Sequence, residues 1–316
     1  MDRPGSADFM HLQRQALASY GVEATSRYLT LGSPPLRAHV LEAGRGGKAV
    51  LLVHGGNSSS ASWLPLLPGR VDHFSLHLVD RPGCGLTGPF DYRGVDLKAH
   101  GAGFLKHVCD GLGLGPVSIV GNSMGGYFAL CLALAHPEYV KKLVLLGEPA
   151  GSSPTAGRFH RMVGTRGLNS LLYATALRPP HDAAGVRASW RKARLVTHPE
   201  RVPEELGDCL AAGSRLPGAS RSWTTMVEQV FVPPGRGLMA RDLIATYALR
   251  PELSRITAPA LFLWGRQDPL GPPEAGQALA SLMPHARLQV VEDAGHLPWI
   301  DQPDVCTEAV TAFLTD

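Results

Sequence analysis

Cysteine is scarce in this sequence, with five residues in 316, and no two of them form a CxxC pair. An odd, scattered set of thiols fits neither a disulfide framework nor the paired spacing of a zinc site. We therefore expect a reduced, cytoplasmic protein that binds no metal. The five residues are Cys84, Cys109, Cys131, Cys209 and Cys306.

Long apolar runs and blocks of one charge are also missing. The longest apolar runs have the length of a strand, far below the ~20 residues that a membrane helix needs. Charged residues such as Arg3 and Asp8 interrupt residues 1–20, where a signal peptide would need an apolar core. The net charge is only +3, with no compact Lys/Arg block of the kind that binds nucleic acid. We expect a soluble protein whose partner is a small molecule, without nucleic acid, membrane or cofactor, and a homodimer is compatible with this composition.

Strand-length apolar segments recur along the chain instead. Most of them do not alternate with polar residues, as is typical of strands that are covered on both faces. Helical patterns lie between several of them, at 95–111, 124–136, 274–283 and 305–314. This alternation predicts an α/β fold with a doubly wound, mostly parallel sheet. The expected strands are 25–31 and 36–42, as an antiparallel lead-in, followed by 49–53, 74–79, 117–120, 143–146, 260–264 and 288–291.

The alternation of strands and helices stops between residues 149 and 259. Short helical patterns separated by Gly and Pro replace it, so we interpret 149–259 as an inserted helical cap. Residues 1–148 and 260–316 would form the core, with 1–24 as an N-terminal helical extension. Residues 149–250 carry fourteen basic and seven acidic residues, which indicates either a solvated surface or arginines that meet an anionic substrate.

The main chemical motif is Gly-Asn-Ser-Met-Gly-Gly at 121–126, between an expected strand and an expected helix. A nucleophile at this position lies on a sharp strand-to-helix turn, and glycines two residues away on either side permit the crowded backbone. Ser123 is therefore the predicted nucleophile.

A serine hydroxyl needs a base within hydrogen-bond reach, normally a histidine held by a carboxylate. His296 follows the strand expected at 288–291 and is the predicted base, with His54 as the rival. Asp268 follows the strand at 260–264 and gives the chain order Ser, Asp, His. Glu148, which follows the strand at 143–146, remains the alternative acid.

Catalysis also needs two backbone N–H groups directed at the oxyanion. The turn His54-Gly55-Gly56-Asn57 follows the strand at 49–53, so we expect the amide of Gly56 to be one donor. The amide of Met124, in the first turn of its helix, is the other.

Together these motifs resemble the α/β-hydrolase superfamily. The resemblance implies an eight-stranded sheet with a lid inserted after the sixth strand, and a serine nucleophile excludes the epoxide hydrolases and haloalkane dehalogenases, which need a carboxylate. The elbow is similar to that of carbon-carbon bond hydrolases, whereas the residues after His54-Gly55 and after His296 differ from theirs. The matching stretches are 54–56, 80–85, 121–126, 264–268 and 295–296, within 36–148 and 260–314.

The sequence thus predicts a serine hydrolase that cleaves an ester, lactone or similar acyl bond of a mid-sized hydrophobic molecule through an acyl-enzyme. Carbon-carbon bond hydrolysis of a diketone-like acid is the first alternative. A lyase, a cyclase or a ligand-binding protein on the same fold is the second. The expected substrate contacts are Asn57, Asn122, Trp190, Trp223 and Trp299.

Overall fold

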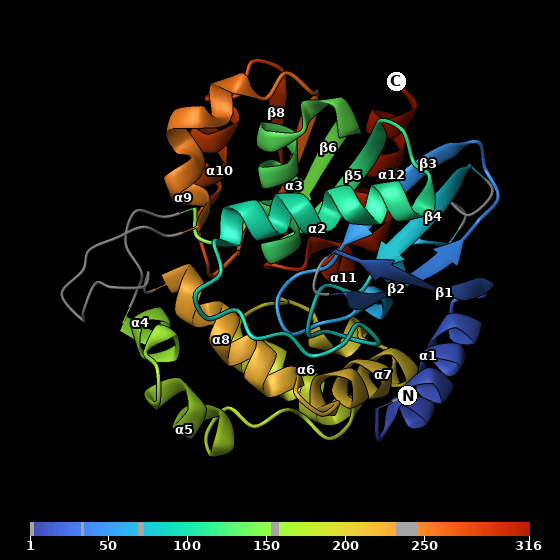
Figure 1. The fold of residues 1–316 in the computed structure, drawn as a ribbon, viewed down its shortest axis with the longest axis vertical. Coiled ribbons are helices and arrows are strands. Elements are labelled where there is room, and N and C mark those ends of the chain that lie inside the picture. Colours follow the sequence, from blue (N-terminus) through green and yellow to red (C-terminus); the bar gives the residue numbers. More distant parts are fainter. Residues whose placement is uncertain (1–2, 33–34, 69–72, 153–157, 232–244) are drawn as a thin grey trace.

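The chain is organised around an eight-stranded sheet with helices on both faces (Figure 1). The computed structural model describes residues 3–32, 35–68, 73–152, 158–231 and 245–316. The strand order is β1-β2-β4-β3-β5-β6-β7-β8. The strands are β1 (Ala24–Leu31), β2 (Leu36–Ala43), β3 (Lys48–Val53), β4 (Phe74–Val79), β5 (Val117–Asn122), β6 (Val140–Leu146), β7 (Ala260–Gly265) and β8 (Ala286–Val291).

The pairing confirms the predicted fold class. β1 pairs antiparallel with β2, and β2 pairs antiparallel with β4. Every other neighbouring pair, from β4–β3 to β7–β8, is parallel. Parallel neighbours end at the same edge of the sheet, so the loops that follow β3, β5, β6, β7 and β8 gather there.

Burial on both faces explains why the strands are continuously apolar. In β3, Leu51 and Val53 pack into the core on one face, whereas Val50 and Leu52 pack into the core on the other. Each of these side chains is at most 2% exposed. A fully buried Val or Leu side chain contributes about 1.5–3 kcal/mol, so neither face tolerates a polar residue.

Helices cover the sheet in two layers. The layer with α2, α3 and α10 buries Phe104, Phe128 and Leu279, and the layer with α1, η1 and α12 buries Phe9, Trp63 and Phe313. The core helices are α1 (Ser6–Ser19), η1 (Ser60–Leu66), α2 (Leu97–Leu112), α3 (Met124–Ala135), η2 (Pro137–Tyr139), α10 (Pro273–Ala280), α11 (Pro298–Asp301) and α12 (Pro303–Thr315).

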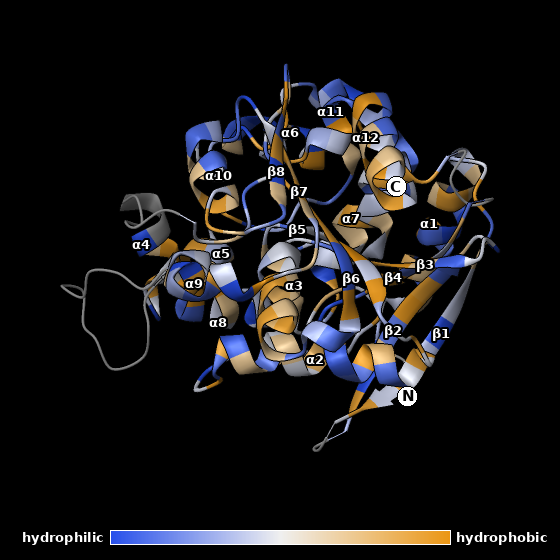
Figure 2. Ribbon diagram, turned by 90° about the horizontal axis from the view of Figure 1, so that it is seen from above, coloured by the Kyte–Doolittle hydropathy of each residue, from blue (hydrophilic) through white to orange (hydrophobic). Residues whose placement is uncertain are grey.

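Helix α3, which follows the elbow, is apolar on every side, and much of it is orange in Figure 2. All its residues except the last are buried, because the sheet lies on one side and α2 on another. None of the helices in the described ranges is both long and apolar enough to cross a membrane.

The predicted cap contains helices between β6 and β7, and α4 to α8 gather together below the strand ends in Figure 1. Residues 153–157 and 232–244 of the predicted cap lie outside the described residues. The elements are α4 (Arg158–Gly164), α5 (Leu168–Ala174), α6 (Ala183–Ala193), η3 (Pro199–Arg201), α7 (Glu204–Arg215), α8 (Ala219–Phe231), α9 (Ala245–Leu249) and η4 (Arg250–Arg255).

Two parts of this region, α7 and η4, contact the core. The N-terminal helix α1 packs on α7, and a Cβ atom at Gly213 would lie 2.9 Å from the ring of Phe9. In η4, Leu253 belongs to the apolar cluster of α2 and α3, and Lys98 of α2 forms an ion pair with Glu252. Helix η4 thus contacts α2 and α3 of the core, and it lies within the stretch predicted as cap.

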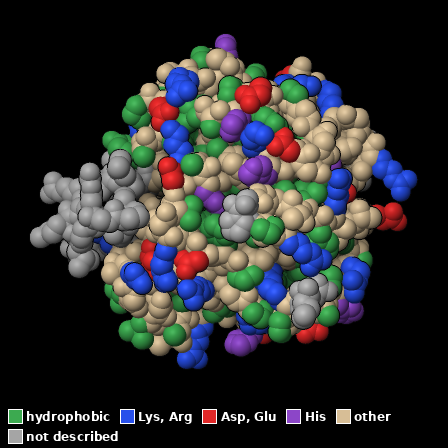
Figure 3. Space-filling model, in the orientation of Figure 1, with side chains coloured by type: hydrophobic (Ala, Val, Ile, Leu, Met, Phe, Trp, Pro, Cys, Tyr) green, Lys and Arg blue, Asp and Glu red, His purple; other side chains and the backbone are tan. Residues whose placement is uncertain are grey.

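The surface carries charges of both signs. Lysine, arginine and acidic side chains are scattered over the face shown in Figure 3, with histidines between them. On the described part of this face, no region of one charge sign stands out.

Candidate active site

Ser123 occupies the tip of the turn between β5 and α3, in a strained conformation with φ 50° and ψ −115°. Positive φ in a residue other than glycine costs about 1–3 kcal/mol and persists only where packing enforces it. Here a Cβ atom at Gly125 would collide with the main-chain oxygen of Val53, and one at Gly121 would lie 2.8 Å from Gly126. The glycines therefore let the turn pack tightly, and Ser123 stays partly exposed while its neighbours are buried.

His296 lies in the loop after β8 and pairs with Asp268, in the loop after β7. Its Nδ1 atom donates to Asp268 Oδ2 across 2.9 Å, and both residues are buried. The carboxylate is itself fixed by two main-chain N–H groups, that of Glu148 on Oδ2 and that of Leu270 on Oδ1, both at 2.9 Å. A carboxylate bound on both oxygens holds the imidazole in one orientation.

The pairing with Asp268 also changes the pKa of the imidazole. Burial disfavours a charged His296, but the charge and hydrogen bond of Asp268, with a smaller contribution from Glu148, raise the pKa of His296 above its usual value. An imidazole with a raised pKa is a stronger base and a better acceptor for the proton of a serine.

Glu148 lies next to the pair without binding the imidazole. Its carboxylate accepts the main-chain N–H of Ser152, and its own N–H donates to Asp268. Burial, with the nearby charge of Asp268, raises the pKa of Glu148 to about 7. In the structure it is thus Asp268, and not Glu148, that receives the hydrogen bond of His296.

Asn122 joins the nucleophile turn to the histidine loop. Its side-chain amide donates to the main-chain oxygen of Leu146 at 2.7 Å and to that of His296 at 3.4 Å. A Cβ atom at Gly147 would collide with the oxygen of His296 and lie 3.3 Å from the same amide. Ser123 and His296 therefore lie at the same edge of the sheet. Because Asn122 is 2% exposed and bound to the protein, we correct its predicted role from substrate contact to positioning.

The turn after β3 lies against Ser123. A Cβ atom at Gly55 would be 3.3 Å from Ser123 Cβ and would collide with the side-chain oxygen of Asn122. Arg81, which is fully buried, donates to the main-chain oxygen of His54 at 2.8 Å and to that of Gly55 at 2.6 Å. In a trans peptide the N–H points opposite to the C=O, so Arg81 turns the N–H of Gly56 away from itself.

The rival base, His54, has both ring nitrogens occupied. Nδ1 donates to Gly55 O at 2.8 Å, and Nε2 accepts the main-chain N–H of Arg81 at 3.1 Å. Burial, with the charge of Arg81, lowers the pKa of His54 to about 3. This histidine is a neutral structural residue of the turn.

The predicted substrate contacts fall into different surroundings. Trp223 of α8 lies directly over Gly56, since a Cβ atom there would collide with its ring, and its indole N–H donates to the hydroxyl of Tyr173. Asn57 follows Gly56 with φ 46° and is partly exposed. Trp190 of α6 is partly buried against the cluster that contains α1 and η1.

Trp299 has the surroundings of a core residue. It is 1% exposed, it stacks on Trp63 with ring centroids 4.7 Å apart, and its indole N–H donates to Ser62 O at 2.7 Å. These contacts occupy the ring on the face of the sheet that carries η1. We therefore correct the predicted substrate contact at Trp299 to a packing role.

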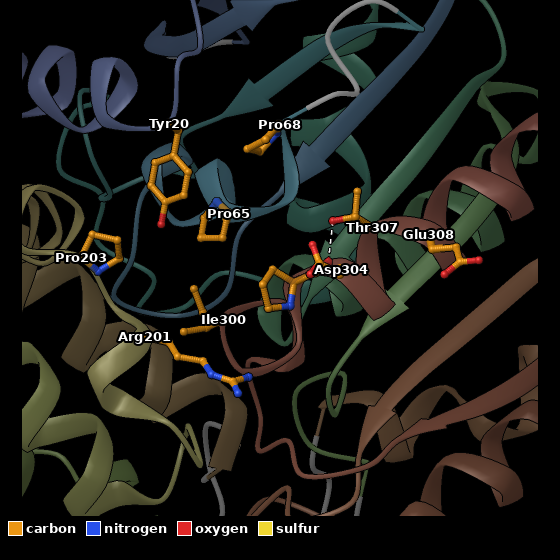
Figure 4. A pocket seen from close by; sticks show the side chains of 10 residues that line it. Tyr20, Pro65, Pro68, Arg201, Pro203, Ile300, Asp304, Thr307 and Glu308 are labelled. Carbon is orange, nitrogen blue, oxygen red and sulfur yellow. Dashed lines mark hydrogen bonds between the residues drawn. The ribbon is translucent and has the colours of Figure 1, made fainter.

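A cavity of about 660 Å³ lies elsewhere in the structure (Figure 4). It is formed by residues of η1, η3, α11 and α12 and by Tyr20, and neither Ser123 nor His296 lines it. Across the described ranges, no group of three or more His, Cys, Asp or Glu residues could hold a metal ion.

Changing Gly56 to alanine tests the contact with Trp223. We expect Gly56→Ala to lower the activity by about 10- to 100-fold, because the new methyl group displaces either the ring or the peptide whose N–H is the predicted oxyanion donor. Trp223→Ala in the same chain should restore part of the loss, relative to Trp223→Ala alone. Gly103→Ala is the matched control, since a Cβ atom there meets nothing within 4 Å. Equal activity of the Gly56 and Gly103 variants would contradict this arrangement.

Residues 48–303 match the family described as alpha/beta hydrolase fold. A 2-hydroxy-6-oxononadienedioate/2-hydroxy-6-oxononatrienedioate hydrolase of Burkholderia vietnamiensis (strain G4 / LMG 22486) is 30% identical over 92% of this chain and 96% of that protein. A hydrolase of the same description from Dechloromonas aromatica (strain RCB) is 29% identical over the same shares. Among solved structures, a carboxylesterase from Bacillus subtilis matches with a TM-score of 0.72 and 20% identity, over 98% of each chain.

Proposed function

Because this chain belongs to the α/β-hydrolase fold family, we propose that it is a serine hydrolase that cleaves an ester, lactone or similar acyl bond of a mid-sized hydrophobic molecule. One observation carries the proposal. The strained Ser123 is connected through Asn122 to His296, and the imidazole of His296 is bound by Asp268. The names of the relatives and of the similar structure support the hydrolase class.

In the first step, Ser123 Oγ attacks the carbonyl carbon of the substrate while His296 takes the hydroxyl proton. The negative charge that develops on the carbonyl oxygen is stabilised by the N–H groups of Gly56 and Met124, each of which is worth roughly 3 kcal/mol in comparable sites. The tetrahedral intermediate then expels an alcohol, which receives the proton from His296. An ester between Ser123 and the acyl group remains.

In the second step, His296 takes a proton from water as the water oxygen attacks the acyl-enzyme. The same N–H groups stabilise the second oxyanion, and Ser123 leaves with the proton returned by His296. Asp268 stabilises the imidazolium through the hydrogen bond to Nδ1. The products are a carboxylic acid and the alcohol.

The α8 side chains that lie over the turn after β3 favour an apolar substrate. Trp223 lies over Gly56, and Met226 of the same helix is buried against the guanidinium of Arg81. With hydrogen bonds to His54 O and Gly55 O, this guanidinium is engaged within the protein. We therefore propose that Trp223 and Asn57 contact the substrate, with Trp190 further along the cap.

A panel of p-nitrophenyl esters tests the proposal. We expect turnover with a maximum of kcat/KM at an intermediate acyl length. A larger apolar group buries more surface, until the α8 side chains over the turn limit the size of the acyl group. No turnover of any ester or lactone by the folded protein would contradict the proposed reaction.

The pH dependence of kcat/KM follows from the His296–Asp268 pair. The neutral imidazole is the base, so the rate falls as the pH drops through the raised pKa of His296. We expect the acidic limb to have its midpoint above the ordinary histidine value of about 6.5. In Glu148→Gln, the loss of a nearby negative charge should move that midpoint to lower pH. A profile that stays flat between pH 5 and pH 9 would exclude a titrating base.

A second candidate is hydrolysis of a carbon-carbon bond in a diketone-like acid. It is favoured by the relatives, whose names give dienedioates and trienedioates as substrates and whose length this chain covers almost completely. Such a substrate has carboxylates, so this reaction would require a cation close to Ser123. Arg194 follows α6, and its main-chain oxygen lies 3.2 Å from a Cβ atom placed on Gly295, next to His296.

The two reactions are separated by assaying 2-hydroxy-6-oxononadienedioate together with the best nitrophenyl ester. If the carbon-carbon bond is the true target, kcat/KM for the dienedioate exceeds that for the ester, and Arg194→Gln raises KM for the dienedioate alone. Arg191→Gln is the matched control, because it is an exposed arginine at the end of the same helix. Our proposal predicts the opposite preference, with no effect of either arginine on the ester.

A further inference from the structure

Asp301 is a buried carboxylate that lies outside the proposed triad. It ends helix α11, five residues after His296, and its exposed fraction is 0%. Oδ2 accepts the N–H of Gly295 at 2.8 Å, and Oδ1 accepts the N–H groups of Thr197 at 2.9 Å and His198 at 2.7 Å. A single side chain thus binds the residue before His296 and two residues between α6 and η3.

These hydrogen bonds are the strong kind, because the acceptor is a carboxylate in a water-poor setting. Burial raises the pKa of Asp301, and the N–H groups of Gly295, His198 and Thr197 act against that rise. Removing the carboxylate would leave the buried N–H of Gly295 and the partly buried N–H groups of Thr197 and His198 without this acceptor. Each such group costs about 1–3 kcal/mol, so the two segments would have to move apart or admit water.

Other contacts join the same two segments. Leu297 donates its N–H to Leu195 O at 3.1 Å, and a Cβ atom on Gly295 would lie 2.7 Å from that oxygen. At the surface, His198 Nε2 donates to Asp293 Oδ2 across 2.6 Å, and Asp293 has a positive φ of 54°. The segments 195–198 and 293–297 are therefore held together on both sides of the histidine.

We infer that Asp301 is a positioning residue, which ties the His296 loop to the cap segment 195–198 so that the alignment of the base depends on the cap. The inference rests on the proposed role of His296 as the base. The cap would then support catalysis by aligning His296, as well as cover the substrate. Ring orientation, and not only substrate binding, should then change when these contacts are altered.

Asp301→Asn is the direct test, because asparagine keeps the volume and replaces one acceptor oxygen by an NH₂ group that faces main-chain N–H groups. We expect kcat for the best ester to fall about 10- to 100-fold, as for supporting residues elsewhere, with KM within twofold of the wild type. The acidic limb of the pH profile should move to lower pH, because a less well aligned Asp268 raises the pKa of His296 less. Asp304→Asn, an exposed acid three residues later, is the matched control and should behave as wild type.

A second set of variants keeps the test valid if Asp301→Asn does not fold. His198→Asn and Asp293→Asn remove the surface pair, and both residues retain solvent access, so folding should survive. We expect each to lower kcat about two- to fivefold and the double variant to lose no more than either single one. The NMR signal of the His296 Nδ1 proton, which does not require turnover, should broaden in the same variants.

The outcomes separate this inference from the proposed function. An inactive wild-type protein would contradict the proposed function. An active wild type, together with Asp301→Asn or the surface variants at unchanged kcat, pH profile and proton signal, would overturn the positioning role alone. A rise in KM at constant kcat would also overturn it, because that result would place these contacts in substrate binding.

Discussion

Replacing Ser123 by alanine is expected to reduce kcat for the best ester by on the order of 10⁵- to 10⁶-fold. Without the hydroxyl group no acyl-enzyme forms, and the reaction is left with the residual effect of binding and of the N–H groups of Gly56 and Met124. The fold should not suffer, because Ser123 is partly exposed and its side chain accepts no hydrogen bond that caps α3. The measurement is kcat of the purified variant, with circular dichroism to verify folding.

Ser118→Ala is a suitable control for this experiment. Ser118 lies in the same strand, β5, and is buried, so it reports the cost of losing a serine hydroxyl from that strand alone. We expect its activity to stay within about threefold of the wild type, because Ser118 lies outside the proposed catalytic residues. A threefold change corresponds to less than about 1 kcal/mol. A Ser123→Ala variant as active as Ser118→Ala would show that another group is the nucleophile.

The second large effect is expected at Asp268. Asp268→Asn should lower kcat by about 10⁴-fold, because the amide can present its NH₂ group to Nδ1 and so favour the wrong tautomer of His296. It also removes the main cause of the raised pKa of His296. The main-chain N–H of Leu270 can still bind the remaining amide oxygen, whereas the N–H of Glu148, which binds Oδ2, then faces the NH₂ group.

Glu148→Gln is the matched variant, an acid-to-amide change at the neighbouring buried position. Its effect should be below about tenfold at pH 8, since Glu148 binds Ser152 and not the imidazole. The comparison is made with one ester at one pH, so that the two variants differ only in the position of the change. If Glu148→Gln were the more damaging substitution, Glu148 would be the acid of the triad.

Sequence patterns were sufficient for the sheet and the nucleophile turn, for a local reason. Strands buried on both faces are continuously apolar, so β4 was expected at the bounds that the structure shows, and β3 within one residue. The turn at Ser123 is equally local, because its glycines must stand two residues to either side. The chain order Ser, Asp, His can also be read directly from the sequence.

The supporting residues could not be predicted, because their roles depend on contacts between distant segments. Arg81 orients the turn after β3 from the loop after β4, and Asp301 binds a segment about a hundred residues earlier in the chain. Trp299 illustrates the converse error, since an aromatic residue next to a catalytic histidine can equally well be a core residue. Only long-range packing distinguishes these cases.

The most direct test of the central claim is to locate the covalent adduct formed by a fluorophosphonate probe. We expect one equivalent of label on the folded protein, found by peptide mass spectrometry on Ser123, and a much slower reaction in His296→Ala. Labelling of another residue, or no labelling of a folded protein that still hydrolyses esters, would contradict the central claim.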